Sequence, residues 1–423
     1  MNKLEDLQIQ KEVLPLFDYT LNSYAQKQLL ELLYKPLSSI ENIKARQEII
    51  KGFLQNQNVL SGYSYTVLYV NEVHSFLSEK SFKGYSKKKL RFKLLRSSNF
   101  KITYRGQINQ LILFFHRLEH QYFKRVKKSH FPSQYAEELD KISEFLAYFQ
   151  TEKYEAIIRE SQLKTKDLVE ISDTIHLLKQ KELIHPFWNR FFLFEAYLSL
   201  SLGIQHNEFT FPQFDENRFE LEDFYHPILD QPVKNSLTTK SKVIVLNGPN
   251  MSGKSTFLKA VGLCIYLAHL GVGIPARKAI LPFFDHFSFA IIKRDDLLNG
   301  YSHFMTEIKN LKSVVELASA GERCFGVLDE LFSGTNLEDG LEICKTTITG
   351  LAKFNSSFFL VSTHIQELKE VAQEGVEHYH IDCQLIDNKP AFTYQLKEGW
   401  SDVKVGRILF EKEGLNKLLR QSK

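Results

Sequence analysis

A glycine-rich segment constrains the fold of this chain more than any other feature. The segment reads Gly248-Pro249-Asn250-Met251-Ser252-Gly253-Lys254-Ser255-Thr256. It follows an apolar, β-branched run at residues 243–246 and precedes a helical pattern of apolar residues that begins at Phe257. A strand, a glycine loop and a helix in this order form the local context of a phosphate-binding P-loop. The order predicts an α/β domain with a nucleotide site at the loop.

The residue types in this segment suit a polyphosphate. Glycines let backbone N–H groups curl around an anion without a Cβ clash. A helix that starts at Lys254 adds its positive N-terminal end. We expect Lys254 to reach the β- and γ-phosphates and the Ser255 hydroxyl to bind Mg²⁺. The predicted cofactors are therefore ATP and Mg²⁺.

Two further apolar runs end in polar residues that belong at the same edge of a parallel sheet. The run 324–328 precedes Asp329 and Glu330, and the run 358–363 precedes His364. Acids at the carboxyl end of a buried strand point into the ligand crevice. We expect Asp329 to hold Mg²⁺ and Glu330 to act as the general base for the attacking water. His364 would sense or stabilise the γ-phosphate. Exposed acids and a structural histidine are the alternative interpretation.

Composition divides the chain near residue 208. Residues 1–208 hold little glycine or proline, and their apolar residues recur at three and four spacing, which predicts α-helices. The pattern at 135–180 predicts extended helices with solvated faces. After residue 209, strands alternate with helices, which predicts a mostly parallel sheet with helices on both faces. The expected fold is an α-helical domain at 1–208 and an α/β P-loop ATPase domain at 209–423.

Charge is unevenly distributed although the net charge is only +4. No acidic residue lies between Glu79 and Glu119, and aromatic residues alternate there with basic ones. Basic side chains on one face neutralise phosphates without sequence-specific contacts. This favours nucleic-acid binding, with another anionic partner or a solvated helix surface as alternatives. The candidate contacts are Lys87, Lys88, Lys89, Arg91, Lys93 and Arg96.

The four cysteines show no metal-ligand spacing, and three lie in apolar runs, which predicts reduced core residues. The first six residues do not read as a signal peptide. The longest apolar stretch, 191–204, is short and contains Glu195, so we expect no membrane-spanning helix. These observations together predict a cytoplasmic protein.

Taken together, these segments resemble the MutS family of DNA mismatch-repair ATPases, which belongs to the ABC-type ATPase group. The family's GPNMGGKST motif corresponds to residues 248–256, and its DEIGRGTS motif corresponds to 329–336. Its STFMVEM segment corresponds to 302–308 and its ATH segment to 362–364. Weaker similarity to the family's core or lever domain extends over residues 14–47.

The resemblance implies further roles. Ser302 would touch the γ-phosphate of a partner subunit, so the active unit would be a homodimer. Val233 and Lys234 lie where the family packs a loop against adenine. Residues 398–402 and Gly406 resemble the family's helix-turn-helix region, which helps hold the dimer together. Phe332 and Ser333 replace the family's Gly-Arg pair, which would alter hydrolysis or signalling between subunits.

The resemblance also implies a function. We expect a dimeric ATPase that couples ATP hydrolysis to binding of double-stranded or structured DNA, in mismatch repair or a related DNA transaction. The family's mismatch-reading and connector domains have no counterpart in the sequence, which leaves open whether a partner protein supplies them. The alternative is a nucleotide-dependent protein-interaction module with no direct DNA role.

Overall fold

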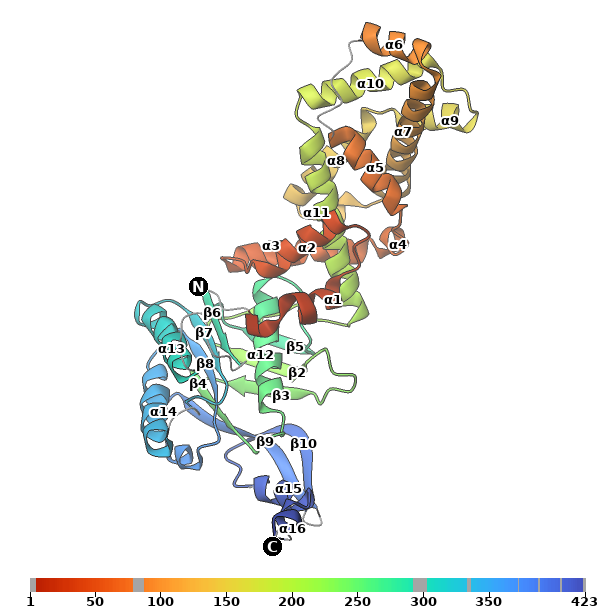
Figure 1. Cartoon of the computed structure of the whole chain (residues 1–423). Helices are drawn as coiled ribbons and strands as arrows, with labels where there is room; N and C mark the ends of the chain where they lie inside the picture. Colours follow the sequence, from red (N-terminus) through yellow and green to blue (C-terminus); the bar gives the residue numbers. More distant parts are fainter. Residues whose placement is uncertain are drawn as a thin grey trace. The chain divides into compact units, whose positions relative to one another are not determined.

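The chain forms two compact units in the computed structural model (Figure 1). The structure describes residues 5–78, 87–291, 303–332, 336–371, 373–386, 389–403 and 405–420. The helical unit comprises residues 17–34 and 44–205. The C-terminal unit comprises residues 1–16, 35–43 and 206–423. The predicted helical character of the N-terminal part is confirmed, while the division into domains at residue 208 remains a prediction.

The helical unit is built around α11 (Ile184–His206), which is apolar on nearly every side and buried along most of its length. A helix with apolar residues all round needs neighbours on every side. The largest fully buried side chains of this core include Phe53, Phe115, Phe187 and Phe194. The other helices are α2 (Ser23–Tyr34), α3 (Ile40–Gln55), α4 (Gln57–Leu60), α5 (Val67–Ser78), α6 (Lys87–Arg96), α7 (Ser98–Arg117), α8 (Ser133–Ala147), α9 (Thr151–Arg159) and α10 (Thr165–Gln180).

The pattern at 135–180 gives three helices, α8, α9 and α10, rather than long continuous ones. Gln150, just before α9, has a φ of 44°, and Ser161, just after it, has a φ of 58°. Left-handed backbone at a single residue ends a right-handed helix. The three-and-four spacing within each helix predicts helical structure but does not state where one helix ends and the next begins.

A buried carboxylate joins separate segments of the helical unit. Glu195 on α11 is 1% exposed and accepts a hydrogen bond of 2.5 Å from the Leu21 backbone N–H. The Asn22 side-chain amide donates to its two oxygens at 3.3 and 3.2 Å, and the Tyr65 hydroxyl donates to Oε2. Burial raises the pKa of Glu195 to about 7, although these donors act in the opposite direction.

The main sheet of the C-terminal unit has the strand order β10-β9-β4-β8-β7-β6. Every pair is parallel except the last hairpin, β9 with β10. The strands β4, β7 and β8 are buried at every residue, as expected when helices cover both faces (Figure 1). The strands are β4 (Val243–Asn247), β6 (His286–Ala290), β7 (Cys324–Leu328), β8 (Phe358–Ser362), β9 (Val376–Ile386) and β10 (Lys389–Glu398).

Helices flank this sheet on its two sides: α12 lies on one side, and α13 and α14 lie on the other (Figure 1). Val243 and Val245 of β4 pack into the cluster that α13 and α14 cover. The alternation of strands and helices along the chain therefore predicted this architecture correctly. The helices of this unit are α12 (Lys254–His269), α13 (His303–Ser319), α14 (Leu337–Leu351), α15 (Gly406–Lys412) and α16 (Leu415–Arg420). Helix α1 (Leu14–Phe17) also belongs to it, except for its last residue.

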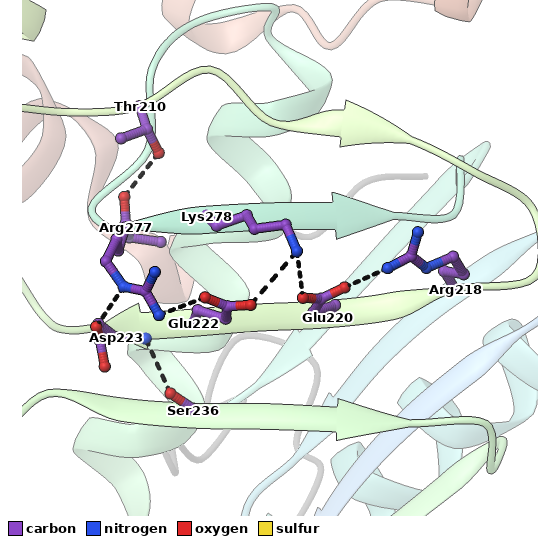
Figure 2. Close-up of polar contacts among 9 residues, drawn as sticks. Thr210, Arg218, Glu220, Glu222, Asp223, Ser236, Arg277 and Lys278 are labelled. Carbon is purple, nitrogen blue, oxygen red and sulfur yellow. Dashed lines mark hydrogen bonds and ion pairs between the residues drawn. The ribbon is translucent and has the colours of Figure 1, made fainter.

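A second, smaller sheet was not predicted. Its strand order is β1-β5-β2-β3, formed by β1 (Gln213–Phe214), β2 (Phe219–Phe224), β3 (Asn235–Thr239) and β5 (Lys278–Leu281). Phe219 and Leu221 of β2 point inward, while alternate residues carry charge on the outer face. Figure 2 shows that face as a ladder of ion pairs in which Lys278 bridges Glu220 at 2.6 Å and Glu222 at 3.4 Å. Opposite charges on neighbouring strands favour this register.

Two sequence expectations concern the whole chain. All four cysteines are buried and unpaired, as predicted. Among the described residues, none of the helices is long and apolar enough to cross a membrane.

Candidate nucleotide site

Three neighbouring parallel strands bring the predicted site residues to one sheet edge. Strand β8 lies between β4 and β7, with Leu246 opposite Ser362 and Leu328 opposite Val361. The segments that follow these strands therefore leave the sheet at the same carboxyl edge. They are the loop 248–253, the pair Asp329-Glu330 and the pair Thr363-His364. An edge of this kind is where open α/β sheets bind ligands.

The loop between β4 and α12 needs left-handed backbone at three positions. Gly248 has a φ of 144°, Met251 a φ of 71° and Gly253 a φ of 97°. A Cβ at Gly248 would lie 3.2 Å from the Ile381 carbonyl oxygen, so any other residue there would crowd strand β9 and strain the backbone. The loop therefore curls tightly and ends at the first turn of α12, whose N–H groups have no helical acceptor.

Lys254, the first residue of α12, is held inside this loop. Its side chain is buried, and its Nζ donates to the carbonyl oxygens of Gly248 at 2.8 Å and Pro249 at 3.2 Å. Burial lowers the pKa of Lys254, whereas the nearby Glu330 and Asp329 carboxylates raise it. A cation in such a place can exchange carbonyl partners for phosphate oxygens, which form stronger charge-assisted hydrogen bonds.

Ser255, Asp329 and Ser362 form a hydrogen-bonded chain beside Lys254. The Ser255 hydroxyl donates to Asp329 Oδ2 at 2.5 Å, and the Ser362 hydroxyl donates to Asp329 Oδ1. The same Ser362 oxygen accepts the Glu330 backbone N–H at 2.7 Å. Ser362 thus holds both acidic residues in place, a role that the sequence did not predict. Glu330 has a φ of 49°, which gives the segment a sharp bend directly after β7.

The remaining loop residues differ in exposure. Met251 is 72% exposed, Asn250 and Thr256 are exposed, and Pro249 is half-buried. The Ser252 hydroxyl is completely buried and has no hydrogen-bond partner among the described residues. An unpartnered buried hydroxyl is costly, and it is available to a ligand that enters the loop.

His364 is exposed and lies two residues beyond β8. The residue between them, Thr363, is buried, and its N–H donates to the Leu246 carbonyl at 3.0 Å, which extends the β4–β8 pairing. The His364 side chain is therefore carried to the same edge as the loop, as its position at the end of the run 358–363 predicted.

A pocket of about 390 Å³ opens beside the loop. Val233 lines it, together with Gly253 and Thr256 of the loop and the ring of Tyr394. Lys234 is exposed and its ammonium lies 5.6 Å from the centre of the Tyr225 ring. The structure therefore brings Val233 to the pocket and directs the Lys234 side chain to its Tyr225 wall.

Sequence reasoning missed Tyr394. Its φ is 57°, at an irregularity in the β9–β10 pairing, and a Cβ at Gly253 would lie 3.1 Å from its ring. The Asn235 side chain holds this segment by donating to the Tyr394 carbonyl at 3.0 Å and accepting the Leu396 N–H at 2.7 Å. A lone tyrosine in a strand pattern carries no signal for this role, because the bulge that turns it is not visible in the sequence.

Two predicted features concern the segments around α13. Ser302 and Ser333 lie outside the described residues. Phe332, which replaces a family glycine, is buried with a φ of 57° and packs edge-on against Phe304 of α13 at 5.8 Å. Phe332 therefore links the segment that follows the acidic pair to the first turn of α13 through an aromatic contact.

The predicted nucleic-acid contacts lie together on α6 of the helical unit, a separate unit from the nucleotide site. Lys88 and Arg91 are exposed, as is Arg96, whose guanidinium lies 5.5 Å from the centre of the Phe92 ring. The others are Lys87, Lys89 and Lys93.

The donor set fits Mg²⁺. This cation is commonly held by one or two protein oxygens, with waters and phosphates completing the octahedron. The Ser255 hydroxyl and the Asp329 carboxylate are already 2.5 Å apart in a hydrogen bond that a cation would replace. Among the described residues no cluster of three or more histidine, cysteine, aspartate or glutamate side chains could hold a metal by itself.

A family model and several known proteins match the part of the chain that carries this site. Residues 244–417 match the family model described as MutS domain V. The DNA mismatch repair protein MutS of Bacillus licheniformis is 28% identical over 212 residues, covering 48% of this chain and 24% of the relative. The protein of the same name from Thermotoga sp. is 32% identical over 206 residues, covering 47% and 26%. This chain therefore matches only 24% to 26% of the length of these relatives.

Proposed function

Because its residues 244–417 are a MutS-family domain V, we propose that this chain binds and hydrolyses ATP with Mg²⁺ at the edge where β4, β7 and β8 end. The observation that carries the proposal is the convergence of Lys254, Ser255 and Asp329 at one point. A buried cation, a hydroxyl and a carboxylate from two strand ends have no evident structural need to meet there. These three groups supply the partners that a nucleoside triphosphate and its cation require.

Each residue has a role in the proposed reaction. Lys254 neutralises the β- and γ-phosphates, and Ser255 and Asp329 hold Mg²⁺, which when bound supplies positive charge to the phosphate oxygens. Glu330 accepts a proton from the attacking water, and His364 donates to the γ-phosphate as charge develops. The N–H groups and hydroxyls of the loop, including Ser252, bind the phosphate oxygens.

The adenine is assigned to the pocket beside the loop. Val233 and Tyr394 offer an aliphatic and an aromatic surface for the base, and both line the same pocket as Gly253, where the phosphates would begin. Lys234 would line its outer wall. A purine between two apolar faces is held mainly by stacking and loss of apolar surface to water.

The active unit is proposed to be a homodimer in which Ser302 of one copy meets the γ-phosphate bound by the other. The C-terminal helices α15 and α16 support this assembly. They expose Phe410 at 40%, Leu415 at 38% and Leu419 at 68%, an apolar content that association would remove from water. Sedimentation with and without ATP measures the dimer directly.

ATP binding is proposed to act on DNA through the helical unit, with the basic residues of α6 on the phosphates. This would place the chain in mismatch repair or a related DNA transaction, as the names of its relatives suggest. If no duplex, branched or single-stranded DNA is retained at low salt, the alternative of a nucleotide-dependent protein-interaction module is favoured.

The test of the enzymatic proposal is steady-state ATP hydrolysis by wild type and Glu330→Gln. Loss of a general base lowers turnover about 10²- to 10⁴-fold. We expect Glu330→Gln to keep ATP binding, lose turnover and accumulate as an ATP-bound dimer. Glu370→Gln, at an exposed glutamate of the same unit, is the matched control and keeps wild-type turnover. Turnover by Glu330→Gln near the wild-type rate would refute the assignment.

A further inference from the structure

Helix α6 exposes large apolar side chains on its solvent side. Its inner face is made by Leu90 and Leu94, each 1% exposed. Phe92 is 61% exposed and Leu95 is 69% exposed. Polar side chains at these two positions would leave the packing of Leu90 and Leu94 intact. Two large apolar residues on one turn of a ten-residue helix are an unusual use of its outer surface.

The helix period places these residues among cations. At 3.6 residues per turn, Phe92 and Leu95 point about 60° apart, and both point away from the buried leucines. Arg96 follows about 40° beyond Phe92, and Arg91 lies about 40° beyond Leu95 on the other side. The outer face of α6 is thus an apolar pair with an arginine on each flank.

The charge around this pair is complementary to a polyanion. No acidic residue lies between Glu79 and Glu119 in the sequence. Two acids of α10 act on α6, and both act on Lys87: Asp173 pairs with it at 2.8 Å, and Glu170 adds a weaker attraction. Lys87 lies at the start of the helix, away from the apolar pair. Lys88, Arg91 and Arg96 are exposed around it.

We propose that the outer face of α6 binds DNA whose bases are unpaired, with Phe92 and Leu95 against the bases and Lys88, Arg91 and Arg96 on the phosphates. This rests on the DNA-binding part of the proposed function and deepens it. A closed duplex presents stacked bases and offers phosphates alone. Only an open or single strand offers base faces, on which aromatic side chains stack without regard to sequence.

The narrow apolar face of α6 and the arginines beside it favour unpaired DNA over a lipid surface as the ligand. A membrane-bound helix needs a broad apolar face, and α6 has already committed its two leucines to the protein core. The Arg96 guanidinium lies 5.5 Å from the centre of the Phe92 ring, a stacking arrangement that a base can extend.

Fluorescence anisotropy of the full-length chain tests the proposal with three oligonucleotides: a single strand, a closed duplex, and the same duplex with a central unpaired bubble. For the double variant Phe92→Ala/Leu95→Ala we expect affinity for the single strand and the bubble to fall about 10-fold or more. Affinity for the closed duplex should change less than about twofold. Phe92→Trp should keep wild-type affinity for all three, because the indole also stacks.

Matched variants separate stacking from charge. Leu68→Ala removes a side chain of α5 that is 59% exposed, and it should leave all three affinities unchanged. Arg91→Ala and Arg96→Ala should weaken binding to all three oligonucleotides, each reducing the salt slope by about 1. Circular dichroism melts establish that the exposed substitutions leave the helical unit folded.

Four results would overturn the inference. Equal losses on open and closed DNA, or no loss on either, would mean that Phe92 and Leu95 do not meet bases; duplex binding and the proposed function would then survive. Binding of α6 to phosphatidylserine vesicles that the double variant abolishes, with DNA affinity unchanged, would assign the face to lipid. Failure of wild type to bind any of the three oligonucleotides would overturn both the inference and the DNA-binding proposal.

Discussion

Glu195 makes the stability of the helical unit depend on pH in an unusual direction. Its carboxyl is buried, and its pKa is raised from 4.5 to about 7 in the folded chain. The folded state therefore holds the proton more tightly than the unfolded state does. The stabilisation from this group is fully present below the unfolded pKa and is lost as pH rises through the folded pKa.

The size of the effect follows from the shift. The difference between 4.5 and about 7, at 1.36 kcal/mol per pH unit, amounts to about 3 kcal/mol. Integrating the two titrations gives a loss of about 2–3 kcal/mol between about pH 5 and pH 8. The substitution Glu195→Gln removes the titrating group, so the difference in unfolding free energy between the variant and wild type should rise with pH by this amount.

Trp188 provides a local reporter. It is one of two tryptophans, lies two turns before Glu195 on α11, and is 2% exposed. In a Trp400→Phe background, urea unfolding followed by tryptophan fluorescence reports the helical unit alone. Glu144→Gln, at an exposed glutamate of α8, is the control and should keep the wild-type pH profile. A Glu195→Gln protein with that same pH profile would contradict the reasoning.

Two further predictions concern the C-terminal unit. Gly326→Ala would place a Cβ 2.7 Å from the Phe359 ring between adjacent buried strands, so thermal melts should show a loss of about 1–3 kcal/mol; no loss would contradict the packing. Ser362→Ala removes the hydroxyl that binds both Asp329 and the Glu330 N–H, so kcat should fall while the KM for ATP changes little; Ser356→Ala, at an exposed serine of the same unit, should leave both constants unaltered.

Sequence patterns predicted the elements of the site well because each has a strong local signal. The runs at 243–246, 324–328 and 358–363 are apolar and short, as buried strands are, and they form β4, β7 and β8. Their order in the sheet then determines that Lys254 and Asp329 meet. The start of α12 at Lys254 also followed from the loop.

The features that the sequence did not predict depend on contacts between distant segments. The small sheet pairs β5 with β2 across more than fifty residues, with charged residues on its outer face that resemble an ordinary solvated surface (Figure 2). Tyr394 reaches the pocket through a left-handed residue in a bulge. Ser362 acts through hydrogen bonds to residues that are 33 and 32 positions away, and no local pattern records them.

Every role proposed for the C-terminal unit requires a nucleotide bound in the loop around Lys254. Equilibrium binding of radiolabelled ATP in the presence of Mg²⁺ tests it most directly, with wild type, Lys254→Ala and Lys259→Ala compared at equal concentration. Lys259 lies on the same helix outside the loop, so its variant controls for loss of a positive charge from α12. We expect wild type and Lys259→Ala to bind ATP and Lys254→Ala not to bind it. Equal binding by all three proteins would contradict it.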